Sequence, residues 1–353
     1  MAVSHRALVG SLLGAAVGDA LGLPYEGLSP RRAARLLGAP TQYRLLPRRG
    51  MVSDDTEHAC MVAQALIASG DDADRFANEL AWRLRRWLLG LPAGIGLATL
   101  KASVRLCLGI SPQRSGVFSA GNGPAMRSAL LGAAIDDLEE LKRFVRVSTR
   151  ITHTDPKAEW GALAVALASR AASQTSPVEP HGFARELRSL VNEPGAEELH
   201  GLVDKVADSV AGGACTESFA ASLGLGSGVS GYIYHTVPVV LHAWLANADD
   251  FSAAVTATIR CGGDADTMAA ITGGIVGSAT GKEAIPADWL AHLVEWPRTV
   301  AWMERLALAL YEARVTRSSS SPPRLPAYGV LPRNAIFAGT VLAHGFRRLL
   351  PPY

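Results

Sequence analysis

The stretch Gly10-Ser11-Leu12-Leu13-Gly14-Ala15-Ala16-Val17-Gly18 is the most informative part of the sequence for the fold. Ala and Leu are strong helix formers. The interspersed small residues let two helices approach closely, because the distance between helix axes depends on the side chains at the contact. This stretch therefore predicts a helix packed tightly against another inside a compact core.

Similar helical patterns recur along the chain. Apolar residues stand at helical spacing over 56–68, 73–89, 157–172 and 268–278, and Gly and Pro separate these runs. Strand signals are weak, because aromatic residues make up only 6% of the chain and two-residue alternation is rare. No strands can be placed between the helices, so a βαβ arrangement is not supported. The sequence predicts an all-α fold, a compact single-domain helical bundle.

Composition narrows the possible partners. The chain has 353 residues, of which 48% are hydrophobic, and a net charge of +2 with dispersed Lys and Arg, which argues against a dedicated nucleic-acid binder. No uninterrupted apolar run reaches the roughly 20 residues needed to span a bilayer. None of the four cysteines forms a C-x-x-C pair, which fits reduced thiols in the cytosol. We expect a cytoplasmic monomer with no membrane partner.

Two acidic clusters each precede an apolar helix. They are Ser53-Asp54-Asp55-Thr56-Glu57 and Gly262-Gly263-Asp264-Ala265-Asp266-Thr267. Carboxylates and hydroxyls are hard oxygen ligands that suit Mg²⁺ or Mn²⁺. If the two helix starts converge, four carboxylates share one site, and their repulsion must be relieved by cations or by protonation. Two metal ions about 3.5–4 Å apart would relieve it.

Helix capping is the alternative interpretation of each cluster. Ser, Thr and Asp are good N-cap residues, and Glu57 follows Asp54 by three positions, as in a capping box. Either cluster alone is better explained by capping, whereas the pair favours a metal site. Convergence of the two helix starts would distinguish these interpretations, and the sequence leaves it open.

Four segments, in this order, resemble the ADP-ribosylglycohydrolase family, whose best-known bacterial member reactivates dinitrogenase reductase. The resemblance covers roughly residues 8–310 and implies an all-helical fold with a cleft that holds a dinuclear Mg²⁺ or Mn²⁺ centre. The segments are Gly14-Ala15-Ala16-Val17-Gly18-Asp19-Ala20-Leu21-Gly22 with Glu26, Ser53-Asp54-Asp55-Thr56, Thr152-His153-Thr154-Asp155-Pro156, and Gly262-Gly263-Asp264-Ala265-Asp266-Thr267.

The resemblance also implies roles for individual residues. Glu26 would lie near the scissile bond, and we expect Glu26 and Asp55 to be catalytic. Asp19 would be structural and hold its loop through backbone N–H groups. The family usually has Thr where this chain has Ala265, and a lost hydroxyl there could loosen the groups that orient the ligands. The implied metal ligands are Ser53, Asp54, Asp55, Asp264, Asp266 and Thr267.

The expected substrate side lies in three further segments. Gly121, Asn122, Gly123 and Met126 resemble a family loop that contacts ADP-ribose; a Gly-Asn-Gly turn leaves N–H groups free to bind an anion, although it is also an ordinary turn signal. Residues 116–119 would line the same cleft, and His153 would contact the ribose or a phosphate. Residues 226–231 match G-x-G-x-x-G without the strand that a dinucleotide fold requires. Gly231 and Tyr232 would instead lie near the adenosine, with Tyr232 or Tyr234 stacked on adenine.

The sequence therefore predicts a metal-dependent hydrolase that cleaves the N- or O-glycosidic bond between ADP-ribose and an acceptor. The partner would be an ADP-ribosylated protein, with a weak preference for arginine linkage, while serine, nucleic-acid and small-molecule conjugates stay open. The alternatives are a dinuclear hydrolase of another nucleotide, phosphoester or ADP-ribose conjugate, and a non-catalytic module that binds ADP-ribose. Residues 1–313 would form the catalytic domain, and 314–353 a Ser/Pro/Arg-rich linker with a last helix over 334–350.

Overall fold

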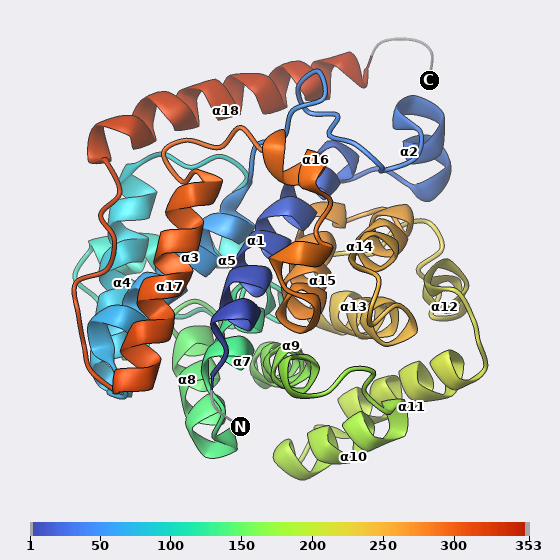
Figure 1. Ribbon diagram of the computed structural model, residues 1–353, viewed down its shortest axis with the longest axis horizontal. Helices are drawn as coiled ribbons and strands as arrows, with labels where there is room; N and C mark the ends of the chain where they lie inside the picture. Colours follow the sequence, from blue (N-terminus) through green and yellow to red (C-terminus); the bar gives the residue numbers. More distant parts are fainter. Residues whose placement is uncertain (1–2, 350–353) are drawn as a thin grey trace.

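The computed structural model describes residues 3–349, and these form an all-helical molecule (Figure 1). Within them no strand forms; paired backbone segments occur only as isolated bridges. The all-α prediction is confirmed. The larger helices are α1 (His5–Gly22), α3 (Asp54–Ser69), α4 (Ala73–Leu89), α5 (Leu97–Cys107), α8 (Leu138–Arg150), α9 (Pro156–Gln174), α10 (Pro180–Leu190), α11 (Glu197–Ala211), α13 (Ile233–Ala246), α14 (Phe251–Arg260), α15 (Ala265–Thr280), α17 (Val300–Thr316) and α18 (Ala327–Arg347).

Shorter helices connect these elements. They include η1, which continues α1 towards the loop of Glu26, and α2, which lies beneath one end of α18 in Figure 1. They are η1 (Leu23–Tyr25), α2 (Pro30–Leu37), α6 (Pro112–Ser115), η2 (Ala125–Arg127), α7 (Ser128–Ala134), α12 (Thr216–Ser222), η3 (Lys282–Ala284) and α16 (Ala287–Ala291).

Helices α1 and α15 lie antiparallel at the centre of the molecule, and their backbones touch (Figure 1). Glycines recur every four residues on the contact side of α1. A β-carbon added at Gly14 would lie 2.2 Å from the carbonyl oxygen of Gly273, and one added at Gly18 would lie 2.0 Å from that of Ala269. At Gly22 the same atom would lie 2.5 Å from the carbonyl oxygen of Ala265. This packing brings the end of α1 to the start of α15, where the second acidic cluster begins.

The apolar helix at the N-terminus differs from expectation in one respect. The segment of α1 and η1, His5–Tyr25, is long and apolar enough to cross a membrane by length and composition, contrary to the sequence analysis. All of its apolar window is buried inside the protein. Neighbouring helices enclose this helix on every side, as is usual for a helix at the centre of a protein core.

The last helix starts earlier than the sequence suggested. The expected linker over 317–332 is non-helical only as far as residue 326, because α18 begins at Ala327 and includes Pro332. Pro332 is the sixth residue of α18, inside the helix, so its missing N–H removes one intrahelical hydrogen bond, which the rest of the helix and its packing must offset. Helix α18 lies across the top of the body in Figure 1 and packs through Phe337 against Leu23, Leu45 and Met51. Leu350, in the expected last helix, lies outside the described residues.

We expect Gly18→Val to destabilise the protein by about 1–3 kcal/mol and to lower activity by displacing α1 from α15. The added side chain would collide with backbone rather than with a movable side chain. Chemical denaturation would measure the change. Gly201→Ala on α11 is the control, because no atom outside its own helix lies within 4 Å of the added β-carbon. Equal stability of both variants would contradict the close packing of the two helices.

Candidate active site

A cleft of about 590 Å³ opens where the starts of α3 and α15 meet the loop that follows η1. Most of the residues that the sequence singled out line this cleft. Ser53 and Asp55 are buried beside Asp54, and Tyr232 lies outside the cleft wall. The predicted residues on the wall are Glu26, Asp54, Gly121, Asn122, Gly123, Met126, His153, Gly231, Asp264, Asp266 and Thr267.

The two acidic helix starts converge, although more than 200 residues separate them in sequence. The Oδ2 atom of Asp55 accepts hydrogen bonds from the hydroxyls of Ser53, at 3.0 Å, and Thr267, at 3.3 Å. Asp55 stands in the first turn of α3, and Thr267 in the first turn of α15. The contact between α1 and α15 sets this arrangement, since it fixes where α15 begins.

Capping explains little of the two clusters. Ser53 caps α3, since its hydroxyl accepts from the N–H of Asp55 at 3.3 Å. Asp264 occupies the N-cap position of α15 but makes no capping hydrogen bond. Its Oδ2 atom instead accepts from the Asn122 side chain at 2.5 Å. Glu57 pairs with arginine side chains rather than with the helix start. The capping interpretation is therefore wrong for Asp264 and Glu57.

The surroundings of the acidic side chains in the cleft strongly disfavour their ionised forms. Burial raises the pKa values of Asp54, Asp55 and Asp266 well above the ordinary range, and the charges of neighbouring acids raise them further. Burial also raises the pKa of Asp264. At the cleft rim, desolvation raises the pKa of Glu26, Asp264 adds to the rise, and Arg348 opposes it. Such a cluster is stable at neutral pH only if cations or protons compensate its charge.

The donor set fits hard divalent cations. Asp55 Oδ1 and Asp266 Oδ1 are buried without a hydrogen-bond partner, and buried polar atoms are normally paired. Within residues 3–349, no three acidic, histidine or cysteine side chains already converge on one point as tightly as a bound ion requires. A cation would have to draw the carboxylates closer together. Asp55 Oδ1 and Asp266 Oδ1 make no hydrogen bond that such a movement would break.

Asp19 supports the first acidic cluster from α1, as expected. Its carboxylate accepts from the N–H of Ser53 at 2.9 Å and from the N–H and hydroxyl of Thr56 at 3.2 Å and 2.5 Å. Burial raises the pKa of Asp19 to about 6, while these hydrogen bonds oppose the rise. Asp19 therefore fixes the backbone on both sides of Asp54 and Asp55.

His153 lies against the glycines of the opposite wall. A β-carbon on Gly121 would lie 3.2 Å from its Nε2 atom, and one on Gly123 would lie 3.1 Å from its Cε1 atom. The Nδ1 atom lies 2.9 Å from the Thr152 hydroxyl. Burial, together with the charge of Arg127, lowers the pKa of His153 to about 3, so the ring is neutral at physiological pH. A neutral ring suits a hydrogen bond to a hydroxyl.

The glycine turn contributes structure more than free N–H groups. The N–H of Gly121 donates to Ser119 Oγ, and that of Asn122 donates to the carbonyl oxygen of Gly231 at 2.9 Å. The expectation of an anion-binding nest is therefore wrong for these two groups. Asn122 has another role, since its side chain donates to Asp264 and to Thr236 Oγ1. The turn orients one of the predicted metal ligands.

Neither of the two aromatic residues expected to stack on adenine lines the cleft. Tyr234 is buried, so it is unavailable for stacking. Tyr232 accepts a hydrogen bond from Lys157 Nζ at 3.1 Å and lies outside the cleft wall. Of residues 116–119, only Ser119 lines the cleft. The missed part of the wall is the loop before α5, with Gly94 and Gly96, and the first turn of α5, with Leu97, Ala98 and Thr99. Its Gly-Ile-Gly pattern was the available signal.

Comparison with known proteins agrees with this geometry. The ADP-ribosylglycohydrolase family model matches residues 2–320. The chain belongs to the ADP-ribosylglycohydrolase family. It is 33% identical over 321 residues to an uncharacterized protein of Archaeoglobus fulgidus, which covers 85% of this chain and 94% of that protein.

Two relatives with named activities are more distant. The ADP-ribosyl-[dinitrogen reductase] glycohydrolase of Rhodospirillum rubrum is 29% identical, with 82% of this chain and 90% of that protein covered. The ADP-ribosylhydrolase ARH3 of Gallus gallus is 28% identical, with 86% and 92% covered. A solved structure described as an ADP-ribosylglycohydrolase-related protein complex matches with a TM-score of 0.62 and 29% identity, covering 88% of this chain and 98% of that one.

Family membership confirms the general activity. The chain is an ADP-ribosyl glycohydrolase, a hydrolase of ADP-ribose conjugates, in a family that is generally metal-dependent. The Ala265 departure lies at a fully buried position at the start of α15, whose backbone is against Gly22.

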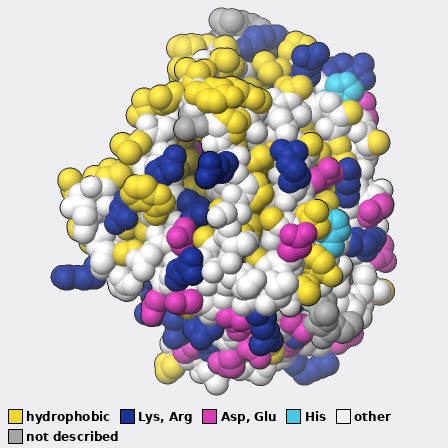
Figure 2. All heavy atoms as spheres, turned by 60° about the vertical axis from the view of Figure 1, so that its left-hand side comes forward, with side chains coloured by type: hydrophobic (Ala, Val, Ile, Leu, Met, Phe, Trp, Pro, Cys, Tyr) yellow, Lys and Arg dark blue, Asp and Glu magenta, His cyan; other side chains and the backbone are white. Residues whose placement is uncertain are grey.

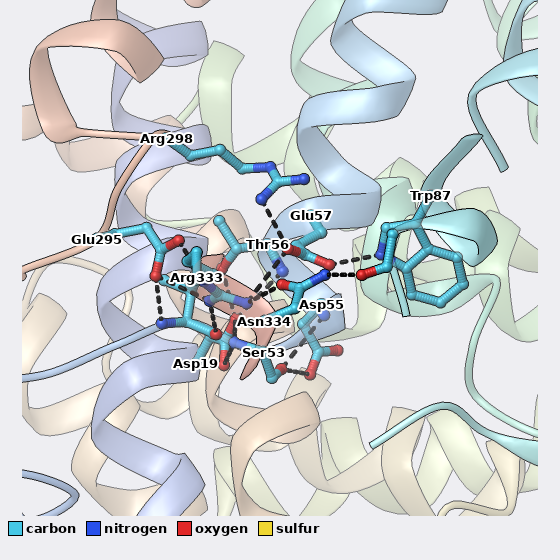
Figure 3. A network of polar contacts seen from close by, with 12 residues as sticks. Asp19, Ser53, Asp55, Thr56, Glu57, Trp87, Glu295, Arg298, Arg333 and Asn334 are labelled. Atoms are coloured by element: carbon cyan, nitrogen blue, oxygen red, sulfur yellow. Dashed lines mark hydrogen bonds and ion pairs between the residues drawn. The ribbon is translucent and has the colours of Figure 1, made fainter. Parts of the chain in front are cut away.

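A buried ionic network lies behind the first acidic cluster of this glycohydrolase (Figure 3). Glu57 accepts from Arg298 Nη1 at 2.7 Å and from Trp87 Nε1 at 2.5 Å. Arg333 donates to the carbonyl oxygen of Val52 at 2.5 Å and to Glu295 at 2.8 Å. Arg333 belongs to α18, beyond the residues that the family model matches. The network fixes the backbone that leads into Ser53 and Asp54.

Proposed function

We propose that this glycohydrolase removes ADP-ribose from a modified side chain of an acceptor protein, with arginine as the first candidate, and that it uses two Mg²⁺ or Mn²⁺ ions. The observation that carries the proposal is the convergence of two acidic helix starts with unpartnered Asp55 Oδ1 and Asp266 Oδ1. Ser53, Asp54, Asp55, Asp264, Asp266 and Thr267 would hold the ions. Bound ions would supply positive charge that neutralises the acids and polarises a water or a ribose hydroxyl.

The protein's own residues account for the remaining chemistry. Water adds to the anomeric carbon as the bond to the acceptor breaks, and the departing nitrogen or oxygen takes a proton. The transition state carries positive charge on the ribose ring. Glu26, at the cleft rim next to Asp264, can accept the proton of the attacking water or stabilise that charge. Neutral His153 would donate to or accept from a sugar hydroxyl, and Asn122 keeps Asp264 oriented.

A panel of ADP-ribose conjugates tests the proposal. Arginine-, serine- and nucleic-acid-linked ADP-ribose would be incubated with the protein and Mg²⁺, Mn²⁺ or a chelator, and the products identified by mass spectrometry. We expect release of ADP-ribose from the arginine conjugate only when a divalent ion is present. Isothermal calorimetry should give two ions per chain. Release that continues unchanged in the chelator, or from the serine conjugate alone, would contradict the metal or the acceptor assignment respectively.

We expect Glu26→Gln to lower kcat by about 10²–10⁴-fold, the usual contribution of a general acid or base. The amide keeps the size of the side chain but can neither accept a proton nor stabilise positive charge. Metal content and ADP-ribose affinity should change little, because the predicted ligand set lacks Glu26. Single-turnover kinetics separate chemistry from binding. Glu283→Gln, on the surface and paired with Arg6, is the matched control and should leave the rate unchanged. A normal kcat for Glu26→Gln would remove Glu26 from the mechanism.

A further inference from the structure

Helix α18 carries a row of large apolar side chains on its outer face, while two of its polar side chains point inward. Six large hydrophobic side chains on its outer face are between 53% and 80% exposed, and every exposed position from 328 to 346 is apolar or glycine. Arg333 and Asn334, in contrast, are buried and bonded to the body of the protein. We call this outer face the α18 stripe; its members are Tyr328, Leu331, Ile336, Leu342, Phe346 and Leu349.

An apolar stripe of this size is unusual on a surface in contact with water only. Large contiguous apolar patches usually mark a surface that another body covers. Figure 2 shows hydrophobic side chains gathered over the top of the molecule, where α18 lies in Figure 1. Lys and Arg side chains lie beside them in the same view.

The stripe is bordered by exposed arginines that have no acidic partner among the described residues. The segments 27–53 and 313–353 each contain six arginines and neither contains Asp or Glu, in a chain with 34 basic and 32 acidic residues. The expectation of dispersed basic residues is therefore wrong for this face. Arg31, Arg32, Arg35, Arg48, Arg49 and Arg347 are exposed, and within residues 3–349 no carboxylate lies within salt-bridge distance of them.

Contacts place these arginines next to α18. Arg32, on α2, donates to the carbonyl oxygen of Arg348 at 3.0 Å, so α2 adjoins the end of the helix. The loop that carries Arg48 and Arg49 packs under the helix, because Leu45 and Met51 contact Phe337. The stripe and the basic rim are thus parts of one surface.

The apolar stripe and the basic rim together indicate what kind of partner covers this surface. A second copy of the chain would cover the apolar stripe but would bring two arginine-rich rims together, which like-charge repulsion disfavours. A nucleic acid would neutralise the arginines but would not accept six large hydrophobic side chains. An anionic bilayer does both, since apolar side chains enter the interface while arginines meet the lipid phosphates. We propose that the α18 stripe and its basic rim dock this protein on an anionic membrane surface. This proposal departs from the expectation of no membrane partner.

Vesicle flotation tests the docking surface. The whole protein would be mixed with vesicles of phosphatidylcholine alone or with added phosphatidylglycerol. We expect flotation only with the anionic vesicles, decreasing as salt increases. Leu342→Asp should abolish it. Arg31→Gln/Arg35→Gln should weaken it by roughly 30-fold, because each basic residue near an anionic surface contributes roughly a factor of five.

Matched controls and light scattering complete the test. Leu108→Asp, at an exposed leucine after α5, and Arg185→Gln/Arg188→Gln on α10 should float like the wild type. Failure of the wild-type protein to float, or equal flotation with neutral vesicles, would overturn the proposal. The proposal would also be overturned if light scattering showed a wild-type dimer that Leu342→Asp converts to a monomer, while no variant binds vesicles. The stripe would then join two copies of the chain. Circular dichroism checks the fold of each variant.

Discussion

Asp266→Asn should abolish turnover while making the metal-free protein more resistant to unfolding. The amide fits the space of the carboxylate but cannot carry the negative charge that a divalent ion requires. In the metal-free protein the same change removes one of several buried acids whose charges repel one another. Loss of activity together with a gain in stability is the signature of a ligand site, whereas a helix cap would lose stability.

The pH dependence of stability provides a second readout of the same variant. Burial and neighbouring acids raise the pKa of Asp266 in the folded protein, so the folded state binds this proton more tightly than the unfolded state does. Stability of the metal-free wild type should therefore fall as pH rises from the ordinary carboxyl range through the raised pKa. In Asp266→Asn this fall should be smaller. Denaturant titrations at several pH values, with chelator present, measure it.

A true cap serves as the control. Asp250 caps α14 by accepting from the N–H of Ala253 at 2.9 Å, and it does not line the cleft. Asp250→Ala should cost about 1 kcal/mol and leave kcat unchanged. Asp55→Asn should behave like Asp266→Asn. If Asp266→Asn kept wild-type turnover, or lost stability as the cap variant does, the acidic cluster would be structural.

Glu57→Ala is expected to destabilise the protein by about 3–5 kcal/mol, the usual cost of removing one partner from a buried ion pair. Glu57 is fully buried, and its loss would leave the buried guanidinium of Arg298 and the indole N–H of Trp87 without their acceptor (Figure 3). The effect is large because the substitution leaves a desolvated charge without a partner, and the lost attraction itself contributes less. Urea denaturation followed by circular dichroism measures the change.

A surface ion pair provides the comparison. Glu79 pairs with Arg83 one turn away on α4 and is partly exposed, so Glu79→Ala should cost less than about 1 kcal/mol. Activity of Glu57→Ala should fall as well, because the network holds the backbone next to Ser53 through Val52 and Arg333. A Glu57→Ala variant as stable as Glu79→Ala would mean that water reaches the network and screens its charges.

The predicted helices over 56–68, 73–89, 157–172 and 268–278 correspond to α3, α4, α9 and α15. These predictions succeeded because strong helix formers, glycine and proline act locally. Helix α18 starts earlier than the sequence predicts, because Pro332 lies inside the helix and not in the linker. The neighbours of Glu57 and Glu26 could not be predicted, since Arg298, Arg333 and Arg348 come from distant segments.

The sequence by itself determined which segments are helical and which carry oxygen ligands, because backbone propensity and ligand chemistry are properties of the residues themselves. It also indicated the close approach of α1, since glycines repeat on one face. Only the tertiary structure decided that Thr267 meets Asp55, that Asn122 donates to Asp264, and that α18 exposes a row of large apolar side chains. These features depend on contacts between residues far apart in the chain. Such contacts are selected by the packing of all the helices together, which no local pattern specifies.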